Sequence, residues 1–313
     1  MRFVALIPIG PGETERERLS DLLASLFHFE APEESGVLLV NDGNSRSQLQ
    51  ELISPYPLVQ SAILDNPREG VGDAWSDGLA VGIFAGLHYL AEHLSGAQFV
   101  LKLDTDSLVI SPFADKIERF FLNQPTIGMV GSHLREPGGA PTNSIAVWTP
   151  RIKKLLRYFT IWNTPTGWQV QFGLWGRDHR IRKLIAQASD RGYTFGESCI
   201  GGGYALSAAT VQKIHHARLL DDPKLFLHRP ITEDVIVSLL AHAVGMRLAD
   251  FNDESQPFGV LWRGLCASPT KLLSRGYSII HSVKDSPDHS ESDTRAFFAK
   301  RRAALNPPHP RQS

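Results

Sequence analysis

Apolar runs alternate with helical patterns along the first 132 residues of the chain. Residues 3–9 are apolar and end at Gly10-Pro11-Gly12, as expected for a buried strand closed by a turn. Repeated alternation of strand and helix predicts a parallel sheet with helices on its faces. We expect strands at 3–9, 36–40, 62–64, 99–103 and 127–132, and helices at 13–29 (with Thr14 a candidate cap), 47–53, 70–92 and 113–123.

The pattern changes after residue 132. Residues 133–196 show no clear period and contain basic clusters at 151–157 and 177–183. Aromatic faces beside hydrogen-bonding groups suit sugars or extended ligands, although the same residues can fill a small secondary core. The tryptophans of this irregular region are Trp148, Trp162, Trp168 and Trp175. Regular elements resume with strands at 200–207, 246–250 and 278–281, helices at 208–216, 232–244 and 291–305, and a loose tail at 306–313.

Two carboxylates, Asp104 and Asp106, follow the predicted buried strand 99–103. Positions i and i+2 lie on the same side of an extended chain, so both acids leave the strand end in one direction. Two carboxylates this close repel each other unless a cation lies between them, and hard oxygen ligands suit Mg²⁺ or Mn²⁺. The alternative interpretation is a surface turn, because Asp and Thr are common in turns.

Composition excludes several classes of protein. The chain has 313 residues, 42% hydrophobic and 21% charged, which is typical of a soluble globular protein with one large or two smaller domains. A net charge of -1 argues against a general nucleic-acid binder. Cys199 and Cys266 form no disulfide or metal pattern and fit a reducing cytoplasm. We expect no signal peptide and no integral membrane span, while peripheral membrane contact is compatible with this composition.

The other predicted strand ends also carry Gly, Asn or Asp, at 8–12, 41–43 and 66–72. In parallel sheets ligands bind beyond the carboxyl ends of the strands. The glycines at 70, 72 and 78 fit either a close approach to phosphates or helix–sheet packing. Neither a P-loop nor a dinucleotide fingerprint is present. The triple glycine at 201–203 lets the backbone approach a ligand closely.

This ordered set of motifs resembles the GT-A glycosyltransferases, which use nucleotide-sugar donors, and within them the large inverting, family-2-like group. The resemblance covers about residues 1–285. Its motifs are Ile7-Pro8 with Gly10–Gly12 (first nucleotide loop), Asn41-Asp42-Gly43 (the DDGS turn), Asn66 with Gly70–Gly78 (the N-x-G segment), Asp104-Thr105-Asp106 (the D-x-D metal motif), Gly201–Gly203 (the acceptor-side loop), Thr232-Glu233-Asp234 (the ED element) and His281 (the late metal-binding histidine).

The sequence departs from this family pattern in two places. The segment that corresponds to the DDGS turn reads Asn-Asp-Gly-Asn at 41–44, and the segment that corresponds to the ARN triplet reads Trp75-Ser76-Asp77. A basic residue that often lies near the phosphates is therefore missing, and Arg68 is the candidate to replace it. The element typical of processive synthases and the membrane helices are absent, which argues against a polysaccharide synthase.

The resemblance implies an α/β fold, a Rossmann-like, mixed and mainly parallel sheet flanked by helices, with an irregular acceptor-side insertion. It implies one GT-A domain over 1–285, with a nucleotide-sugar-binding half (1–132) and an acceptor-binding half (133–285). Residues 286–313 would add a C-terminal helix and loose tail.

The resemblance also implies a hexosyltransferase-type activity that uses a UDP-sugar or another nucleoside-diphosphate sugar. The acceptor would be a hydroxyl of a glycan, a lipid-linked molecule or a small compound. Mn²⁺ or Mg²⁺, held by Asp104, Asp106 and His281, would neutralise the leaving diphosphate. Asp234, with Glu233 as second candidate, would be the general base of an inverting reaction. The donor would contact Pro8, Gly10, Asp42, Asn66, Arg68, Asp104 and Gly202.

Simpler interpretations compete with this one. A lone histidine beside an apolar strand is usually structural, and acids at 233–234 are stabilised by the helix dipole whatever their function. A nucleotidyltransferase of sugar phosphates joins a similar sheet to an acid–metal site, but its basic glycine-rich loop is poorly matched by the GPGETER sequence at 10–16. An inactive nucleotide-binding protein that keeps the fold is the other alternative.

Overall fold

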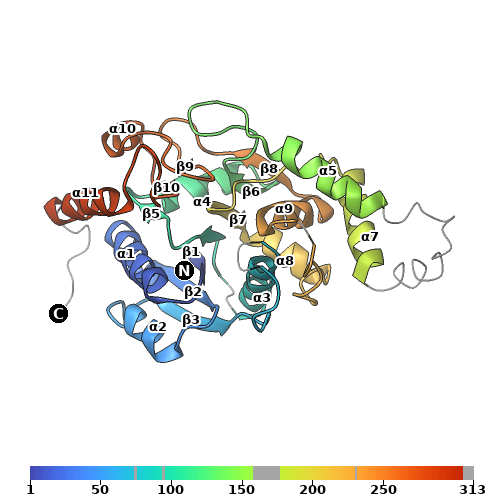
Figure 1. Cartoon of the computed structure of the whole chain (residues 1–313), viewed down its shortest axis with the longest axis horizontal. Coiled ribbons are helices and arrows are strands. Elements are labelled where there is room, and N and C mark those ends of the chain that lie inside the picture. Colours follow the sequence, from blue (N-terminus) through green and yellow to red (C-terminus); the bar gives the residue numbers. More distant parts are fainter. Residues whose placement is uncertain (74–75, 94–95, 158–176, 230, 306–313) are drawn as a thin grey trace.

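A seven-stranded mixed sheet forms the centre of the molecule, with strand order β3-β2-β1-β4-β7-β6-β8 (Figure 1). The computed structural model describes residues 1–73, 76–93, 96–157, 177–229 and 231–305. Neighbouring strands in one half are parallel, which confirms the predicted fold class. The strands of this half are β1 (Phe3–Ile9), β2 (Ser35–Asn41), β3 (Gln60–Asp65) and β4 (Phe99–Leu103).

The second half of the sheet makes it mixed. Strand β7 (Gly203–Ser207) runs antiparallel to both β4 and β6 (Ile127–Gly131), and β6 pairs in parallel with β8 (Arg247–Asp250). A separate small sheet has the order β5-β10-β9 and lies beyond the end of β4. Its strands are β5 (Leu108–Val109), β9 (Phe258–Val260) and β10 (Ile279–His281).

Helices cover both faces of the large sheet because alternate strand residues face opposite sides. On one side Phe3, Ala5 and Ile7 pack with α1 (Glu13–Phe29), α2 (Arg46–Ile53) and α4 (Ala114–Asn123). On the other side Val4 and Leu6 share a core with five helices. These are α3 (Asp77–His93), α5 (Ser144–Arg157), α7 (Arg177–Asp190), α8 (Ala208–His216) and α9 (Glu233–Ala243).

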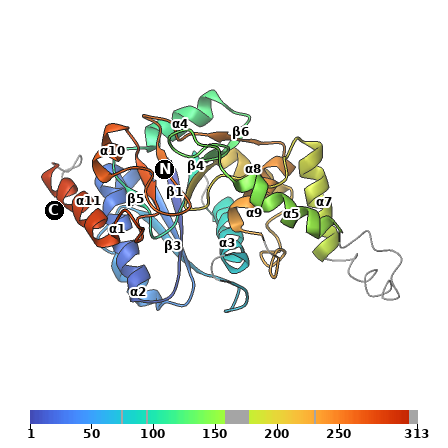
Figure 2. The same cartoon turned by 45° about the horizontal axis from the view of Figure 1, so that its top comes forward.

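The C-terminal helix α11 (Glu291–Ala304) packs against α1 and α10 (Pro269–Ser274) (Figure 2). Charged groups join α11 to α1: Arg18 pairs with Glu291, and Asp21 pairs with Arg295 at 2.8 Å. None of the described helices combines the length and apolar character needed to cross a membrane.

Several predicted elements need correction. The region 133–196 contains α5 and α7, two helices that the expected irregular insertion lacked. Pro150 lies inside α5, and tertiary packing of Ile152 and the apolar side of α7 into the core overrides its cost. The cap of α1 is Gly12 instead of Thr14. The sequence analysis did not predict β5, β9, α10 or the 3-10 helix Pro32–Glu34. Some predictions cannot be compared with the structure because their residues lie outside the described ranges: Trp75, Trp162, Trp168, Trp175 and the tail 306–313.

Glycines allow α3 to lie close to the sheet. A Cβ at Gly86 would lie 2.6 Å from Leu6 Cδ1, and one at Gly82 would lie 2.9 Å from Val40 Cγ1. At Gly78 a Cβ would meet the Asp73 carbonyl oxygen at 2.7 Å. Close packing therefore requires glycine at these positions, whereas a Cβ at Gly70 would meet open space.

This packing predicts that Gly86→Val is destabilising, because added methyl groups in a filled core force shifts that cost about 1–3 kcal/mol. Urea unfolding measures the change in the free energy of unfolding. The matched control is Ala85→Val, which adds a β-branched side chain at the neighbouring, half-buried position of the same helix. Equal losses for the two variants would contradict the close helix–sheet contact.

Candidate active site

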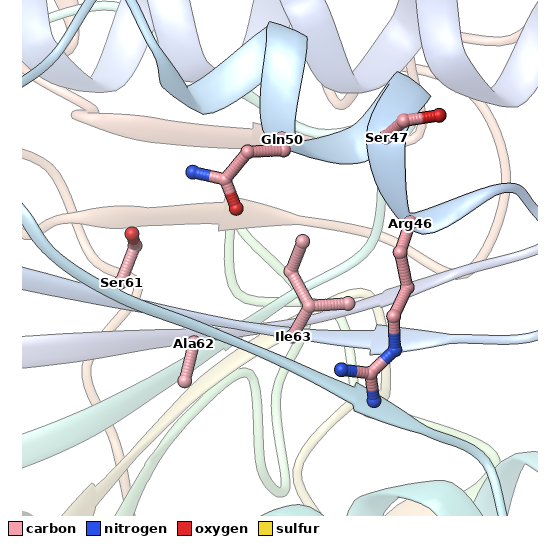
Figure 3. A pocket seen from close by; sticks show the side chains of 6 residues that line it. All are labelled: Arg46, Ser47, Gln50, Ser61, Ala62 and Ile63. Carbon is pink, nitrogen blue, oxygen red and sulfur yellow. The ribbon is translucent and has the colours of Figure 1, made fainter.

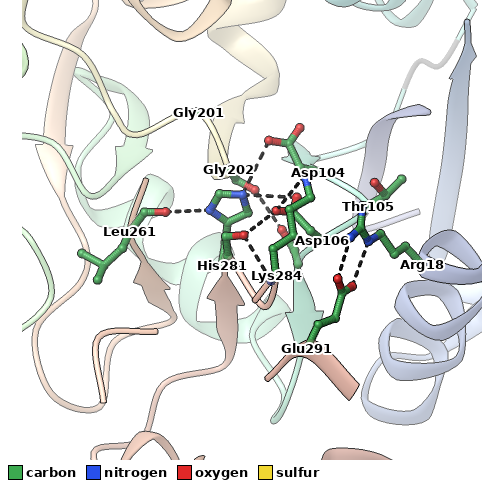
Figure 4. A network of polar contacts seen from close by, with 12 residues as sticks. Arg18, Asp104, Thr105, Asp106, Gly201, Gly202, Leu261, His281, Lys284 and Glu291 are labelled. Carbon is green, nitrogen blue, oxygen red and sulfur yellow. Dashed lines mark hydrogen bonds and ion pairs between the residues drawn. The ribbon is translucent and has the colours of Figure 1, made fainter. Parts of the chain in front are cut away.

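Three side chains suited to metal binding converge at the end of β4 (Figure 4). Asp104 and Asp106 come from the turn after β4, and His281 comes from the end of β10. One ligand atom from each of the three residues can be chosen so that all lie within 4.8 Å of one another. Among the described residues this is the one group of His, Cys, Asp and Glu gathered closely enough to hold an ion.

Hydrogen bonding fixes the orientation of the His281 ring. Nδ1 lies 2.6 Å from the carbonyl oxygen of Leu261, which can only accept, so Nδ1 carries a proton. Nε2 then faces Asp106 Oδ1 at 3.3 Å and Asp104 Oδ2 at 3.8 Å. Burial alone would lower the pKa of His281, but the Asp106 carboxylate reverses this and raises it. In the neutral ring Nε2 presents its lone pair to the same space, as in oriented metal-binding histidines.

Asp106 is the most enclosed of the three, with 4% of its surface exposed. The hydroxyl of Ser282 donates to its Oδ2 at 2.5 Å, and Lys284 Nζ lies 3.3 Å from the same oxygen. Burial would raise the pKa of Asp106, but His281 and Lys284 lower it well below its usual value. Two carboxylates and one imidazole nitrogen form a donor set that fits Mn²⁺ or Mg²⁺.

The turn that carries these acids is anchored to α1. The hydroxyl of Thr105 donates to Glu15, and Glu15 pairs with Arg18 at 2.7 Å. Arg18 in turn binds Glu291 at the start of α11 (Figure 4). Both neighbouring acids are therefore attached to a turn held by two helices.

The glycine loop before β7 separates the metal-binding group from a second pair of acids. A Cβ at Gly202 would lie 2.0 Å from His281 Nδ1, and a Cβ at Gly201 would lie 2.6 Å from Glu233 Oε1. Any side chain at either position would displace its neighbour. The loop thus places its backbone between His281 on one side and the Glu233–Asp234 helix start on the other.

Lys102 connects the same parts from inside the sheet. Its side chain is 1% exposed, and Nζ contacts Asp104 Oδ1 at 2.6 Å, Glu233 Oε1 at 3.2 Å and the carbonyl oxygen of Gly201. Burial opposes the charge, but the two carboxylates raise the pKa of Lys102 above its usual value. The ammonium group is therefore a permanent cation among groups that would otherwise repel one another.

Asp234 lies at the start of α9 in a different environment from its neighbour. It is half-buried and accepts a hydrogen bond from the hydroxyl of Thr232. Burial and, after it, the charge of Glu233 raise the pKa of Asp234 to about 7. A carboxylate with a pKa near neutrality suits a general base.

The ends of β1, β2 and β3 bring the expected donor-binding residues to the edge that carries Asp104. Pro8 lies near the end of β1, and the backbone carbonyl of Gly10, the first residue after this strand, accepts a hydrogen bond from the Asn44 side chain at 2.9 Å. Asp42 follows β2 and donates its backbone N–H to Ile9. The parallel register makes these positions neighbours, as the strand pattern predicts.

Arg68 is held tightly against Asp42. Its Nε lies 2.8 Å from Asp42 Oδ1, its Nη2 lies 2.7 Å from Oδ2, and its Nη1 donates to the carbonyl of Gly72 at 3.0 Å. Asn66 accepts from the backbone N–H of Arg68 and donates to the carbonyl of Gly78 at 3.1 Å. These contacts brace the loop before α3, and the site roles of the three residues stay predictions.

Lys102, Ser282 and Lys284 are site residues that the sequence analysis did not identify. The signal for Lys102 is visible, since a lone lysine interrupts the apolar strand 99–103 and shares a side with Asp104 by the i, i+2 rule. Ser282 and Lys284 follow His281 directly, but nothing in their local pattern indicates a contact with Asp106.

A separate shallow cavity of about 380 Å³ lies between α2 and the edge strand β3 (Figure 3). Its lining contains none of the predicted site residues. The lining residues are Arg46, Ser47, Gln50, Ser61, Ala62 and Ile63.

No protein-family model and no curated protein matches the chain. Among solved structures it is similar to mouse xyloside xylosyltransferase 1, with 12% identity over 90% of this chain and 97% of that chain and a TM-score of 0.48. It is also similar to the galactosyltransferase LgtC bound to donor and acceptor sugar analogs, with 10% identity over 100% and 98% and a TM-score of 0.49.

A third similar structure is the mannosyltransferase PcManGT from Pyrobaculum calidifontis, in complex with GDP-Man and Mn²⁺. Its identity is 13% over 97% of this chain and 63% of that chain, with a TM-score of 0.44. All three of these proteins are glycosyltransferases. Likeness at this level assigns no activity to the chain, whose chemistry depends on its own residues.

Removing the buried ammonium tests the contacts of Lys102. Lys102→Met leaves Asp104 and Glu233 uncompensated, and we expect the free energy of unfolding to fall by about 3–5 kcal/mol. The double variant Lys102→Met/Glu233→Gln removes one of the two charges and is expected to regain part of the loss. Urea unfolding of the two variants measures this, and a single variant as stable as the parent protein would contradict the buried ion pairs.

Proposed function

We propose that the protein is a metal-dependent glycosyltransferase that moves a hexosyl group from a nucleoside-diphosphate sugar to a hydroxyl acceptor. One observation carries the proposal: the glycine loop at 201–203 lies directly between the Asp104–Asp106–His281 group and the Glu233–Asp234 pair. A site for a cation and a carboxylate with a raised pKa are thus close neighbours. Group transfer from a diphosphate to a hydroxyl needs both.

The residues around the metal-binding group would prepare it for the leaving diphosphate. Mn²⁺ or Mg²⁺ held by Asp104, Asp106 and His281 would act as a Lewis acid toward the phosphate oxygens. Ser282 fixes the Asp106 carboxylate by donating to Oδ2, and Leu261 fixes the tautomer of His281. Lys102 compensates the charge of Asp104 on the side facing the core.

Asp234 is our proposed general base. In its deprotonated form it would accept the proton of the acceptor hydroxyl as that oxygen attacks the anomeric carbon, with inversion at that carbon. Its pKa of about 7 allows a substantial fraction to be ionised at neutral pH while it remains basic. Glu233 is the weaker candidate because Lys102 and Gly201 hold it in a buried position.

The donor nucleotide would bind at the edge formed by the ends of β1, β2 and β3. Pro8, Gly10 and Gly202 would allow backbone contact, and the Asp42–Arg68 pair with Asn66 would orient base, ribose or phosphate. We propose a UDP-sugar as donor. Residues 1–132 would then form the donor half and 133–285 the acceptor half of one domain, with 286–313 an appended segment, acting in the cytoplasm on a glycan, lipid-linked or small acceptor.

The competing nucleotidyltransferase interpretation needs free basic side chains after the first strand. Arg16 donates to Asn44 at 3.1 Å, and Arg18 is occupied by Glu15 and Glu291. Both arginines near the Gly10–Gly12 turn therefore contact protein groups. This arrangement favours the glycosyltransferase over the nucleotidyltransferase.

Thermal unfolding with UDP, GDP, CMP and dTDP, each with and without Mn²⁺, tests the proposed donor site. A ligand that binds only the folded protein at 100 times its Kd adds about 2.7 kcal/mol of stability. We expect the UDP shift to be largest and to require Mn²⁺. In Asp106→Asn the Mn²⁺-dependent part is expected to disappear, whereas Asp253→Asn, at an exposed acid elsewhere, retains it. The absence of any shift would contradict the proposed donor site.

The role of Asp234 predicts a specific pH dependence. A general base works when deprotonated, so kcat/KM is expected to rise with pH through a pKa near 7 and to level off above it. Asp234→Asn is expected to lose about 10²–10⁴-fold in kcat and to lose this pH limb. Donor turnover over pH 5.5–9 measures both. A variant that keeps the parent's rate and profile would show that another group takes the proton.

A further inference from the structure

Helices α5 and α7 form a strongly basic end of the molecule. The segments Ser144–Arg157 and Arg177–Asp190 contain eight Lys and Arg but two Asp, whereas the whole chain has a net charge of -1. Figures 1 and 2 show both helices at one end of the long axis, opposite α10 and α11. The charge of the protein is thus unevenly distributed.

Helical spacing separates the basic side chains of these helices from the core. The inner side of α7 buries Ile181, Leu184 and Ile185 in the core shared with α9. Lys183 lies on the outside of this helix, where it is exposed. In α5 the exposed Val147, Arg151 and Lys154 follow i, i+4 and i+7 spacing and therefore share one face, with Lys153 exposed beside it. We call the exposed faces of α5 and α7 the basic end.

Three exposed lysines of the basic end have no compensating acid among the described residues, although Arg180 of α7 pairs with Asp222 at 2.9 Å. Arg18 and Arg295 pair with carboxylates elsewhere in the protein. Lys153, Lys154 and Lys183, by contrast, form no ion pair with any residue in the described part of the chain. Residues 158–176, which connect the two helices in sequence, contain no Asp or Glu. Acids are therefore sparse at this end: α5 and α7 contain two, Asp178 and Asp190, against eight Lys and Arg, whereas an ordinary solvated face mixes both signs of charge more evenly.

We propose that the basic end binds the anionic lipid headgroups of a membrane surface. The exposed lysines lie on two helices at one end of the molecule (Figures 1 and 2), which suits a broad anionic surface that contacts both helices. Lysines near an anionic bilayer each add favourable electrostatic energy, and an apolar side chain such as the exposed Val147 suits the headgroup boundary.

The position of this surface connects it to the candidate site without depending on the proposed activity. Ser144 Oγ lies 2.7 Å from Ser198 Oγ, and the hydroxyl of Thr149 donates to the carbonyl of Phe195 at 2.5 Å. The segment 195–198 leads directly into the glycine loop at 201–203. Membrane binding through α5 would therefore hold the glycine-loop side of the candidate site near the lipid surface.

Co-sedimentation with vesicles tests this proposal. We expect the full-length protein to bind vesicles of phosphatidylcholine and phosphatidylglycerol (3:1) and not to bind vesicles of pure phosphatidylcholine. It is expected to detach as the salt concentration rises from 50 to 500 mM, because salt screens the attraction between surface charges. Lys153→Glu/Lys154→Glu/Lys183→Glu is expected to lower the partition coefficient by about tenfold or more. The matched control Lys271→Glu/Lys300→Glu/Arg301→Glu changes the net charge equally at the opposite end and is expected to bind like the parent.

Each remaining outcome overturns the proposal. Equal loss in both triple variants would mean that only net charge matters, and equal binding to neutral vesicles would remove the role of the lysines. Retention of the parent on dextran sulfate with no vesicle binding would identify an anionic polymer as the partner. UDP-induced thermal shifts measured in the same variants show whether the candidate site is intact, so its failure is distinguishable from failure of membrane binding.

Discussion

The buried ammonium of Lys102 is the interaction on which the candidate site depends. Desolvating a charge is costly unless partners surround it, and here Asp104, Glu233 and the Gly201 carbonyl provide them. These partners belong to the turn after β4, the start of α9 and the loop before β7. One cation therefore holds three segments together that lie far apart in the sequence, and it does so from the strand where the parallel half of the sheet meets the antiparallel half.

The acids of the candidate site lie in different environments, and their pKa values differ as a result. Asp106 is surrounded by His281, Ser282 and Lys284, which hold its pKa low and keep it charged, as its proposed role of metal ligand requires. Asp234 has a buried, negatively charged neighbour and a pKa of about 7, which suits the proposed role of general base. The same chemical group thus acquires a low pKa at Asp106 and a raised pKa at Asp234, because the surroundings differ. Glu233 takes neither task, because its contact with Lys102 makes it part of the framework.

The sequence indicates the sheet well because buried strands such as β1 and β4 are continuous apolar runs bounded by turn residues. It fails at α5, where Pro150 argues against a helix whose stability comes from tertiary packing. The i, i+2 relation of Asp104 and Asp106 is local and predictable. The approach of His281 is not, since it is set by the small sheet in which β10 pairs with β5, and only resemblance to a family suggested it.

The glycine loop shows why the site requires both sides of the fold. Gly202 leaves room for the His281 ring, and Gly201 leaves room for the Glu233 carboxylate. A side chain at either glycine would collide with its neighbour, so only bare backbone fits between the two groups. The carbonyl of Gly202 also accepts from the Ser107 hydroxyl at 2.9 Å and from the Asp104 backbone N–H at 3.2 Å. A shift of this loop would therefore move His281, Asp104 and Glu233 together. The metal-binding group and the helix start that carries the proposed base therefore pack against adjacent residues of one loop.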